Sequence, residues 1–280
     1  MEVKENAQRN ARNKKKFKIL GISVWRALLY FIIYSIVGYI IETIFGLVTK
    51  GVLESRKSFL YGPFCSIYGI GAVIMILGLQ YFKKNNYSLF FGGFLIGSIV
   101  EYIISWIGEF IFHIKWWDYS NMAFNLNGRI CVAFSLFWGV LAIYLMTHFN
   151  PFVDRLIDKI PKIYIKTVAI IGITIIIVNC LITAFALKMF FARLVQNNNL
   201  ELQSTQEYLL EYTKLYNENE KIRKITDRFF SDEKMLKTFP NIKVTGKNGE
   251  IIFISDILNN IQPYYFRLFT PKHIKEGEYK

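Results

Sequence analysis

Three acidic side chains lie inside long runs of apolar residues. Glu42, Glu101 and Glu109 are each flanked by aliphatic and aromatic residues, and an ionised side chain near a bilayer centre costs about 2.5–3.5 kcal/mol on insertion scales. Such residues need a proton, a polar partner or a wet cavity. Arg129 begins a later apolar run and is a candidate partner, because a guanidinium can pair with a carboxylate in bidentate fashion.

The spacing of these acids predicts that they lie between helices. Residues four apart share a helix face, and small residues on that face let two membrane helices approach closely. Two such series occur: Tyr34, Gly38, Glu42 and Gly46, and then Gly93, Gly97, Glu101, Ser105 and Glu109. Ordinary helix packing explains the glycines equally well. For the glutamates, we expect burial in a polar centre, although an interfacial position could also account for Glu109 and Glu42.

The polar residues map to one half of the membrane. If the first and third apolar runs cross in the same direction, Glu42 and Glu109 lie near the same surface, with Glu101 deeper. Asp118 and Arg129 are expected to pair with each other or with the glutamates. The expected substrate-binding or polar centre comprises Glu42, Arg56, Glu101, Ser105, Glu109, Asp118, Asn125 and Arg129.

Hydropathy predicts the elements that position this centre. The chain has 280 residues, 53% of them hydrophobic, and its apolar runs fill the first two thirds. We predict an all-α integral membrane protein with about five transmembrane helices, at 26–48, 61–82, 88–112, 130–148 and 165–187. Residues 149–164 predict an amphipathic helix in the membrane interface, with Asn150 as its cap, Pro151 in its first turn, and Phe152, Leu156, Ile157 and Ile160 on one face.

The remaining segments are polar. Residues 1–24 form a basic N-terminus, 25–189 the transmembrane domain and 190–280 a soluble C-terminal tail. The tail predicts amphipathic helices, and Asn248-Gly249 between two apolar stretches predicts a hairpin.

Charge and cysteine content exclude several classes of protein. The net charge is +13, and much of it lies beside the apolar runs, which is typical of a cytoplasmic N-terminus in a multi-pass protein of the cell membrane. No base-reading motif accompanies the charge, so we expect membrane lipid as a partner and no nucleic acid. The three cysteines have no metal-ligand spacing, and we expect no disulfide framework, metal or cofactor.

Three stretches together resemble a known family. The order "SRKSFLYGPFCSIYGIGA", "EYIISWIGEFIF" and "WWDYSNMAFNLNGRICVAFSLFWG" is similar to the bacterial putative ABC-transporter type IV (CmpB-like) permease family over about residues 30–145. The matching positions are Arg56, Phe59, Leu60, Gly62, Pro63, Cys65, Tyr68 and Gly69; Glu101, Ser105 and Glu109; and Trp117, Asp118, Tyr119, Phe124, Asn125, Gly128, Arg129, Ser135, Trp138 and Gly139.

The chain departs from this pattern at two places. Ser66 stands where the resemblance leads us to expect a proline, and the tail after about residue 190 has no recognised counterpart. The resemblance implies a transport permease. The chain has no G-x-x-x-x-G-K-[ST] phosphate loop, so any ATPase would be a separate subunit.

Two other classes of function stay open. One is an accessory, scaffold or sensor protein, with the tail as its binding module and a separate membrane partner or a second copy of the chain as its target. The other is a membrane-embedded enzyme, because paired carboxylates with an arginine can do acid–base chemistry. A strong nucleophile with an adjacent base is missing from the sequence, which disfavours the enzyme.

Overall fold

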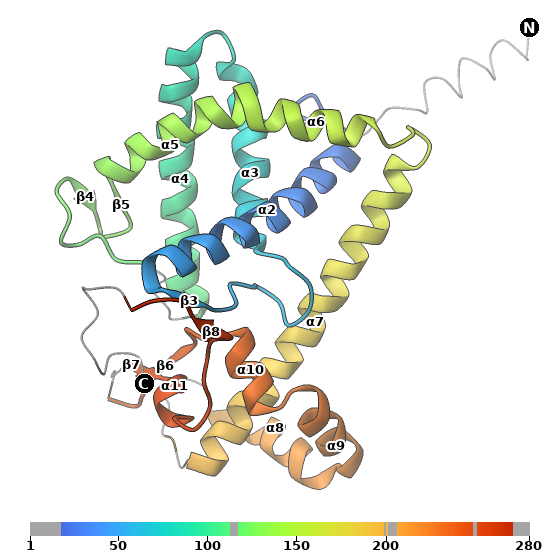
Figure 1. The fold of residues 1–280 in the computed structure, drawn as a ribbon, viewed down its shortest axis with the longest axis vertical. Coiled ribbons are helices and arrows are strands. Elements are labelled where there is room, and N and C mark those ends of the chain that lie inside the picture. The colour runs from blue at the N-terminus through green and yellow to red at the C-terminus, as the bar shows by residue number, and fades with distance from the viewer. Residues whose placement is uncertain (1–17, 113–116, 199, 201–205, 249–250, 271–280) are drawn as a thin grey trace, which may run out of the picture. The chain divides into compact units, whose positions relative to one another are not determined.

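The computed structural model describes residues 18–112, 117–198, 200, 206–248 and 251–270. Helices dominate this part of the chain, and its strands are only two or three residues long (Figure 1). The long helices are α2 (Val24–Lys50), α4 (Asn86–Phe112) and α7 (Ile165–Asn198). A fourth stretch joins α5 (Val132–Tyr144), a π-helical turn (Leu145–Phe149) and α6 (Asn150–Asp158) without a break.

Four helical stretches are long and apolar enough to cross a bilayer. They are Val24–Lys50, Asn86–Ile107, Val132–Asp158 and Ile165–Asn198. Their outward-facing residues are large and apolar, such as Phe45, Phe91 and Leu181. A helix satisfies its own backbone hydrogen bonds, which is why it can hold such surfaces in lipid. The protein is therefore a helical integral membrane protein, as predicted.

The prediction for the second span is wrong in its extent. Helix α3 covers only Ser66–Leu79 and continues as a 3-10 turn over Gln80–Phe82, while residues 61–65 are not helical. Together these two elements are shorter than the roughly 20 residues that a bilayer core requires. The described residues therefore hold four candidate spans and one shorter apolar helix, where about five spans are predicted.

The helix predicted over residues 149–164 is present over Asn150–Asp158, with Pro151 in its first turn, but the prediction that Asn150 caps it is wrong. The chain passes from α5 into α6 through the π-helical turn, and Asn150 has ordinary helical backbone angles. Its side chain is buried and bonds to other side chains, so it caps no helix. Val153 and Ile157 form the buried face of α6, whereas Phe152 is exposed. Whether α6 lies in the membrane interface stays a prediction.

Short strands pair the connecting segments. Strands β1 (Lys18–Ile19) and β2 (Ile22–Ser23) form a hairpin before α2, and β4 (Asn125–Leu126) and β5 (Ile130–Cys131) form one before α5. Strand β3 (Val52–Leu53) follows α2 and pairs antiparallel with β8 (Phe266–Arg267) of the tail. Gly51, at φ +68°, ends α2, and a Cβ there would lie 1.9 Å from the Phe269 carbonyl oxygen. Only glycine fits this position.

The tail is folded. It contains α8 (Gln206–Glu218), α9 (Glu220–Phe229), α10 (Asp232–Thr238) and α11 (Ile254–Ile257). Asn219 and Ser231 cap α9 and α10 by accepting bonds from the backbone N–H groups of Ile222 and Lys234. The predicted hairpin is present as β6 (Lys243–Thr245) paired with β7 (Ile251–Phe253). Gly249, in its predicted turn, lies outside the described residues.

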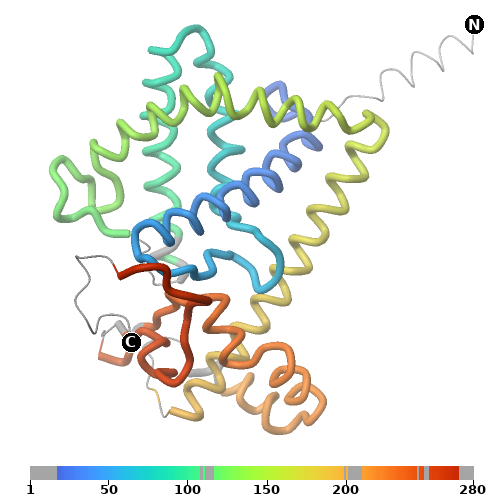
Figure 2. Tube along the Cα trace, in the orientation of Figure 1, coloured from blue at the N-terminus to red at the C-terminus, as the bar shows by residue number. Residues whose placement is uncertain are grey.

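The chain divides into two compact units, each built from two separate stretches of the sequence. Figure 2 shows the path of the chain through these stretches, coloured by residue number. The first unit comprises residues 1–34 and 68–172, and its core includes Leu29, Ile76, Leu79 and Ile157. The second comprises residues 35–67 and 173–280, and its core joins Leu60 and Phe190 to tail residues such as Met235 and Ile254. The division predicted at residues 24 and 189 separates membrane-spanning from water-exposed segments. The two compact units do not test that division, and it stays a prediction.

Candidate functional site

Close packing of α4 on α5 positions Glu101 in the first unit. The four-residue series on α4 faces α5: a Cβ at Gly93 would lie 2.2 Å from the Ala142 Cβ, and one at Gly97 would lie 2.5 Å from Trp138. Small residues are required at both positions, because Gly93 lies against the α5 backbone and Gly97 against the Trp138 side chain. The next residue in the series, Glu101, is only 6% exposed.

Two aromatic side chains hold the Glu101 carboxylate. The Tyr119 hydroxyl donates to Oε1 at 2.9 Å, and the Trp138 indole Nε1 donates to Oε2 at 2.9 Å. The Tyr119 ring stacks on Phe134, with 4.6 Å between centroids, which fixes its direction. Burial of the Tyr119 hydroxyl beside this carboxylate raises the pKa of Tyr119 well above its ordinary value.

The partners of Glu101 differ from the expected guanidinium. Among the described residues, no cation lies within ion-pair distance of this carboxylate. Each carboxylate oxygen accepts one hydrogen bond from a neutral donor and keeps a second lone pair that can accept another. We define Glu101, Tyr119 and Trp138 as the Glu101 cluster. Arg129 instead directs Nη1 toward the Ser105 hydroxyl at 3.4 Å and lies over the Tyr102 ring, 5.7 Å from its centroid.

The β4–β5 hairpin places Tyr119 within reach of α4. Asn127 and Gly128 have φ angles of +55° and +66°, and the Arg129 amide bonds to the Leu126 carbonyl at 3.0 Å, which together make a type I′ turn. The Tyr119 amide donates to the Gly128 carbonyl at 2.8 Å. The turn is therefore joined directly to the residue that binds Glu101.

Other residues of the predicted centre build this loop. The Asn125 amide group accepts from the Gly128 backbone and donates to the Met122 carbonyl, at 3.0 and 2.8 Å. Asp118 accepts from both the backbone and the hydroxyl of Ser120. Trp117 donates to the Arg129 carbonyl at 2.9 Å. These are local bonds within the connection, so Asn125 and Asp118 shape the loop that carries Tyr119.

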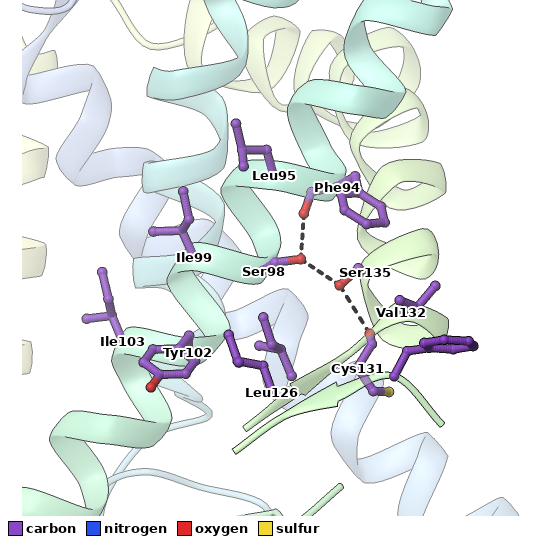
Figure 3. Close-up of a pocket in the computed structure, with 12 residues that line it drawn as sticks. Phe94, Leu95, Ser98, Ile99, Tyr102, Ile103, Leu126, Cys131, Val132 and Ser135 are labelled. Carbon is purple, nitrogen blue, oxygen red and sulfur yellow. Dashed lines mark hydrogen bonds between the residues drawn. The ribbon is translucent and has the colours of Figure 1, made fainter. Parts of the chain in front are cut away.

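An apolar pocket of about 420 Å³ lies beside the Glu101 cluster in the same unit. Figure 3 shows it bounded by α4, the β4–β5 hairpin and the start of α5. At its polar end wall the Ser98 hydroxyl donates to Ser135 at 2.7 Å, and Ser135 donates to the Cys131 carbonyl at 3.1 Å. The pocket itself was not predicted, because it depends on the position of the hairpin.

The second unit holds Glu42 and Arg56. Glu42 lies half-buried on α2. Arg56 pairs with Glu54, whose side chain is only 5% exposed, at 2.7 Å, and Lys50 binds the same Glu54 oxygen at 2.8 Å. A Cβ at Gly46 would lie 3.1 Å from the Arg56 guanidinium, so the small residue makes room for this ion pair. Sequence reasoning missed Glu54, although its spacing from Lys50 is that of a helical ion pair.

Residues 56–65 form an irregular segment in the second unit, and they pack on α7, which is long and apolar enough to cross a membrane. The backbone amides of Leu60 and Tyr61 donate to Thr183 and Asn179 of α7, at 2.8 and 3.2 Å, and Asn179 donates back to the Tyr61 carbonyl. The Cys65 amide donates to the Ser35 carbonyl, at 2.8 Å, in the middle of α2. Inside a bilayer, irregular backbone is tolerated only where the protein itself satisfies its hydrogen bonds. We call residues 56–65 the re-entrant segment.

The motif "YGPFCSIYG" builds this segment. Gly62 has a φ of +75°, and a Cβ there would meet the Phe64 ring at 2.5 Å. Pro63 cannot donate a backbone bond, which suits a non-helical stretch. Cys65 is buried, and Tyr68 and Gly69 lie in the first turn of α3. Asn179 and Thr183 are one helical turn apart on α7. This spacing is visible in the sequence and could have predicted that polar backbone packs against α7.

A second polar cluster joins α2 to α6 in the first unit. Arg26 binds Asp154 at 2.7 Å and Asp158 at 2.9 Å, and the Tyr30 hydroxyl also donates to Asp154. Deeper along the helices, Tyr34 donates to the buried Asn150 at 3.4 Å. Sequence reasoning missed this cluster because its residues are more than a hundred positions apart.

One residue of the predicted polar centre, Glu109, is described by its backbone alone. Glu109 lies within α4, but its side chain falls outside the described residues.

Within the described part of the chain, no three His, Cys, Asp or Glu side chains gather into a metal site. Gly139 packs against Phe90 across the α4–α5 contact, where a Cβ would lie 2.8 Å from the ring.

Fold and site together define a helical membrane protein in which buried polar groups and irregular backbone pack on apolar helices. The model of the family described as "Putative ABC-transporter type IV" matches residues 29–184, more than half of the chain. The chain belongs to this family, which confirms the resemblance seen in its motifs. No curated protein and no solved structure matches the chain.

Proposed function

We propose that this chain is the membrane-spanning permease subunit of a transporter in a bacterial cell membrane, with the Glu101 cluster at its polar centre. The burial of Glu101 carries the proposal: an acidic side chain, 6% exposed, lies on a membrane helix and is held by two directed donors. Acidic groups inside membrane helices are expensive to bury and mark pathways for ions, protons or polar substrates.

The re-entrant segment supports the same class of function. Transporters use non-helical backbone at membrane depth to line a binding site or a water-filled path. In the second unit, Asn179 and Thr183 support such backbone. A protein that served only as an anchor would need neither feature, because an uninterrupted apolar helix anchors a chain equally well.

The proposed transporter needs an ATPase that the chain does not supply. The sequence has no phosphate-binding loop, so the nucleotide would bind to a separate subunit. The basic residues Arg12, Lys14 and Lys15 favour a cytoplasmic N-terminus, and the ATPase would dock on that side. A permease with its partner attached should then transmit changes at Glu101 to ATP hydrolysis.

Purification of the tagged full-length chain from its native membranes tests the proposal. Mass spectrometry identifies the co-purifying subunits, and phosphate release measures ATP hydrolysis in the complex. Glu101→Gln keeps the shape of the side chain and removes its charge. Glu218→Gln, in the exposed tail helix α8, is the matched control.

We expect an ATPase to co-purify with the wild type and with both variants. Glu101→Gln should change the rate of ATP hydrolysis by about tenfold, because hydrogen bonds to a charged group contribute about 1.5–3 kcal/mol. Glu218→Gln should hydrolyse ATP at the wild-type rate. Absence of any ATPase from the wild-type preparation, or equal rates in the two variants, would refute the permease assignment.

The folded tail supports a second candidate function, that of an accessory or scaffold protein. The tail has its own secondary structure and exposes Leu210, Ile225 and Phe229 on α8 and α9. Such a protein would bind a membrane partner through the tail and would not respond to Glu101→Gln. Deletion of the tail is a poor test, because it would uncover Leu60 and Phe190. Ile225→Ser is the better variant, and loss of a partner with Ile225→Ser alone would favour the scaffold.

A further inference from the structure

Residues 264–269 of the tail expose a run of large apolar side chains. Tyr265, Phe266, Leu268 and Phe269 are 53%, 48%, 64% and 44% exposed. They lie in and beside β8, whereas other residues of the tail build the core of the second unit. Contiguous exposed apolar side chains mark a surface that contacts a membrane or another molecule.

Backbone hydrogen bonds hold this segment at the end of α2, within the second unit. Strand β8 pairs antiparallel with β3, which follows α2 after a single residue, Gly51 (Figure 1). The Leu268 amide donates to the Gly51 carbonyl at 2.7 Å, and the Tyr265 amide donates to the Leu53 carbonyl at 2.8 Å. The segment is therefore tied to backbone within three residues of the end of a candidate membrane span.

The length and surface of α2 indicate that its end lies at the membrane surface. With 27 residues the helix is about 40 Å long, whereas the hydrocarbon core of a bilayer is about 30 Å thick. Its exposed side chains stay apolar almost to the end, since Phe45 and Val48 are 61% and 65% exposed. Lys50 then ends the helix. We therefore expect the head groups at the level of Lys50, beside β3 and β8.

The pairing of β8 favours this interface over the hydrocarbon core. Strands β3 and β8 form a two-stranded sheet, so within the described part of the chain the outer edge of β8 has no neighbouring strand. Backbone groups on such an edge need water, which the hydrocarbon core does not supply. The apolar side chains of the same segment favour removal from water. The head-group region meets both requirements, and tyrosine is enriched there.

We propose that residues 264–269 anchor the tail in the bilayer interface beside the end of α2, with Leu268 among the upper parts of the lipid chains. The partner is the lipid surface that surrounds α2, because the backbone bonds hold the segment at the end of that helix. The contact is apolar and requires no charged lipid. It does not depend on the proposed transport function, and it holds whichever side of the membrane the tail occupies.

Fluorescence quenching of the full-length protein in phosphatidylcholine nanodiscs, one copy per disc, tests the proposal. Cys180→Ser removes the exposed thiol, while Cys65 and Cys131 are buried and do not react in the folded protein. In this background Leu268→Cys carries a single polarity-sensitive fluorophore. A count of one label per chain confirms that the variant is folded.

Two control positions bracket the expected depth. Lys224→Cys labels the exposed face of α9, where the lysine side chain is 74% exposed. Leu181→Cys labels the middle of α7, a candidate span, at a residue that is 66% exposed. Three quenchers are compared at each position: iodide in the water, a nitroxide near the head of the acyl chain, and a nitroxide at the chain end.

We expect the nitroxide near the head of the chain to quench Leu268→Cys several-fold more strongly than it quenches Lys224→Cys. Iodide should show the reverse order, and the emission of Leu268→Cys should lie at shorter wavelength than that of Lys224→Cys. The chain-end nitroxide should quench Leu181→Cys most strongly. This pattern would place Leu268 in the interface, above the middle of the span.

Three other patterns would overturn the proposal. Quenching of Leu268→Cys by iodide as strong as that of Lys224→Cys would place the segment in water. Protection from all three quenchers would show that protein covers it, and stronger quenching by the chain-end nitroxide than by the other would place it in the hydrocarbon core. If Leu268→Cys takes up more than one label, Tyr265→Cys, at a residue that is 53% exposed, replaces it with the same expected outcomes.

Discussion

Gly93→Ala should separate α4 from α5 and destabilise the protein. A methyl group at this position would lie 2.2 Å from the Ala142 Cβ and 2.8 Å from the Trp138 carbonyl oxygen. The second of these atoms is backbone, so no side-chain rotation relieves the contact. The helices must move apart, and Trp138 would move away from Glu101.

The magnitude follows from two opposing terms. Overpacking of a closely packed contact costs about 1–3 kcal/mol. Alanine also favours the helix over glycine by about 0.5–1 kcal/mol. Gly71→Ala on α3 isolates the second term, because no described atom lies within 4 Å of a Cβ at that position. The two variants should therefore differ in stability by the cost of overpacking alone, about 1–3 kcal/mol, with Gly93→Ala the less stable.

Thermal unfolding of the detergent-solubilised protein measures this difference through its cysteines. A thiol-reactive fluorophore reaches the buried Cys65 and Cys131 only on unfolding, while the exposed Cys180 gives a constant background. At 2–4 °C per kcal/mol, the two apparent melting temperatures should differ by roughly 2–12 °C. If Gly93→Ala unfolds at or above the temperature of Gly71→Ala, the α4–α5 contact does not have the tight packing on which the Glu101 cluster depends.

Three further perturbations test other contacts. Asp154→Asn should lower the apparent melting temperature more than Asp158→Asn in the same assay, because the second carboxylate is 63% exposed and an exposed pair contributes less than about 1 kcal/mol. Asn179→Leu should increase trypsin cleavage in the re-entrant segment, because it removes both bonds to the Tyr61 backbone. Burial raises the pKa of Tyr119, so its contribution to stability is complete below about pH 10 and is lost as the pH rises further. Unfolding measured from pH 8 to 11 should show a shallower loss of stability in Tyr119→Phe.

The sequence predicts which face of α4 is buried but not what binds Glu101. Spacing by four residues identifies the face, because helical geometry depends only on local sequence. The two donors are 18 and 37 positions away from Glu101, on a loop and on the next span. Tertiary packing brings them together, and no local pattern encodes that contact. An arginine was the expected partner because burial of a charge favours an opposite charge, yet directed neutral donors also satisfy the carboxylate.

Hydropathy cannot distinguish a spanning helix from a short helix joined to a re-entrant segment. Residues 61–82 carry no charged side chain and are mostly apolar, so a hydropathy window includes the non-helical stretch before Ser66. The information lies elsewhere in the chain, in Asn179 and Thr183, whose side chains satisfy that stretch. Two polar residues one helical turn apart in an apolar span therefore predict that a non-helical segment of the chain packs against that span.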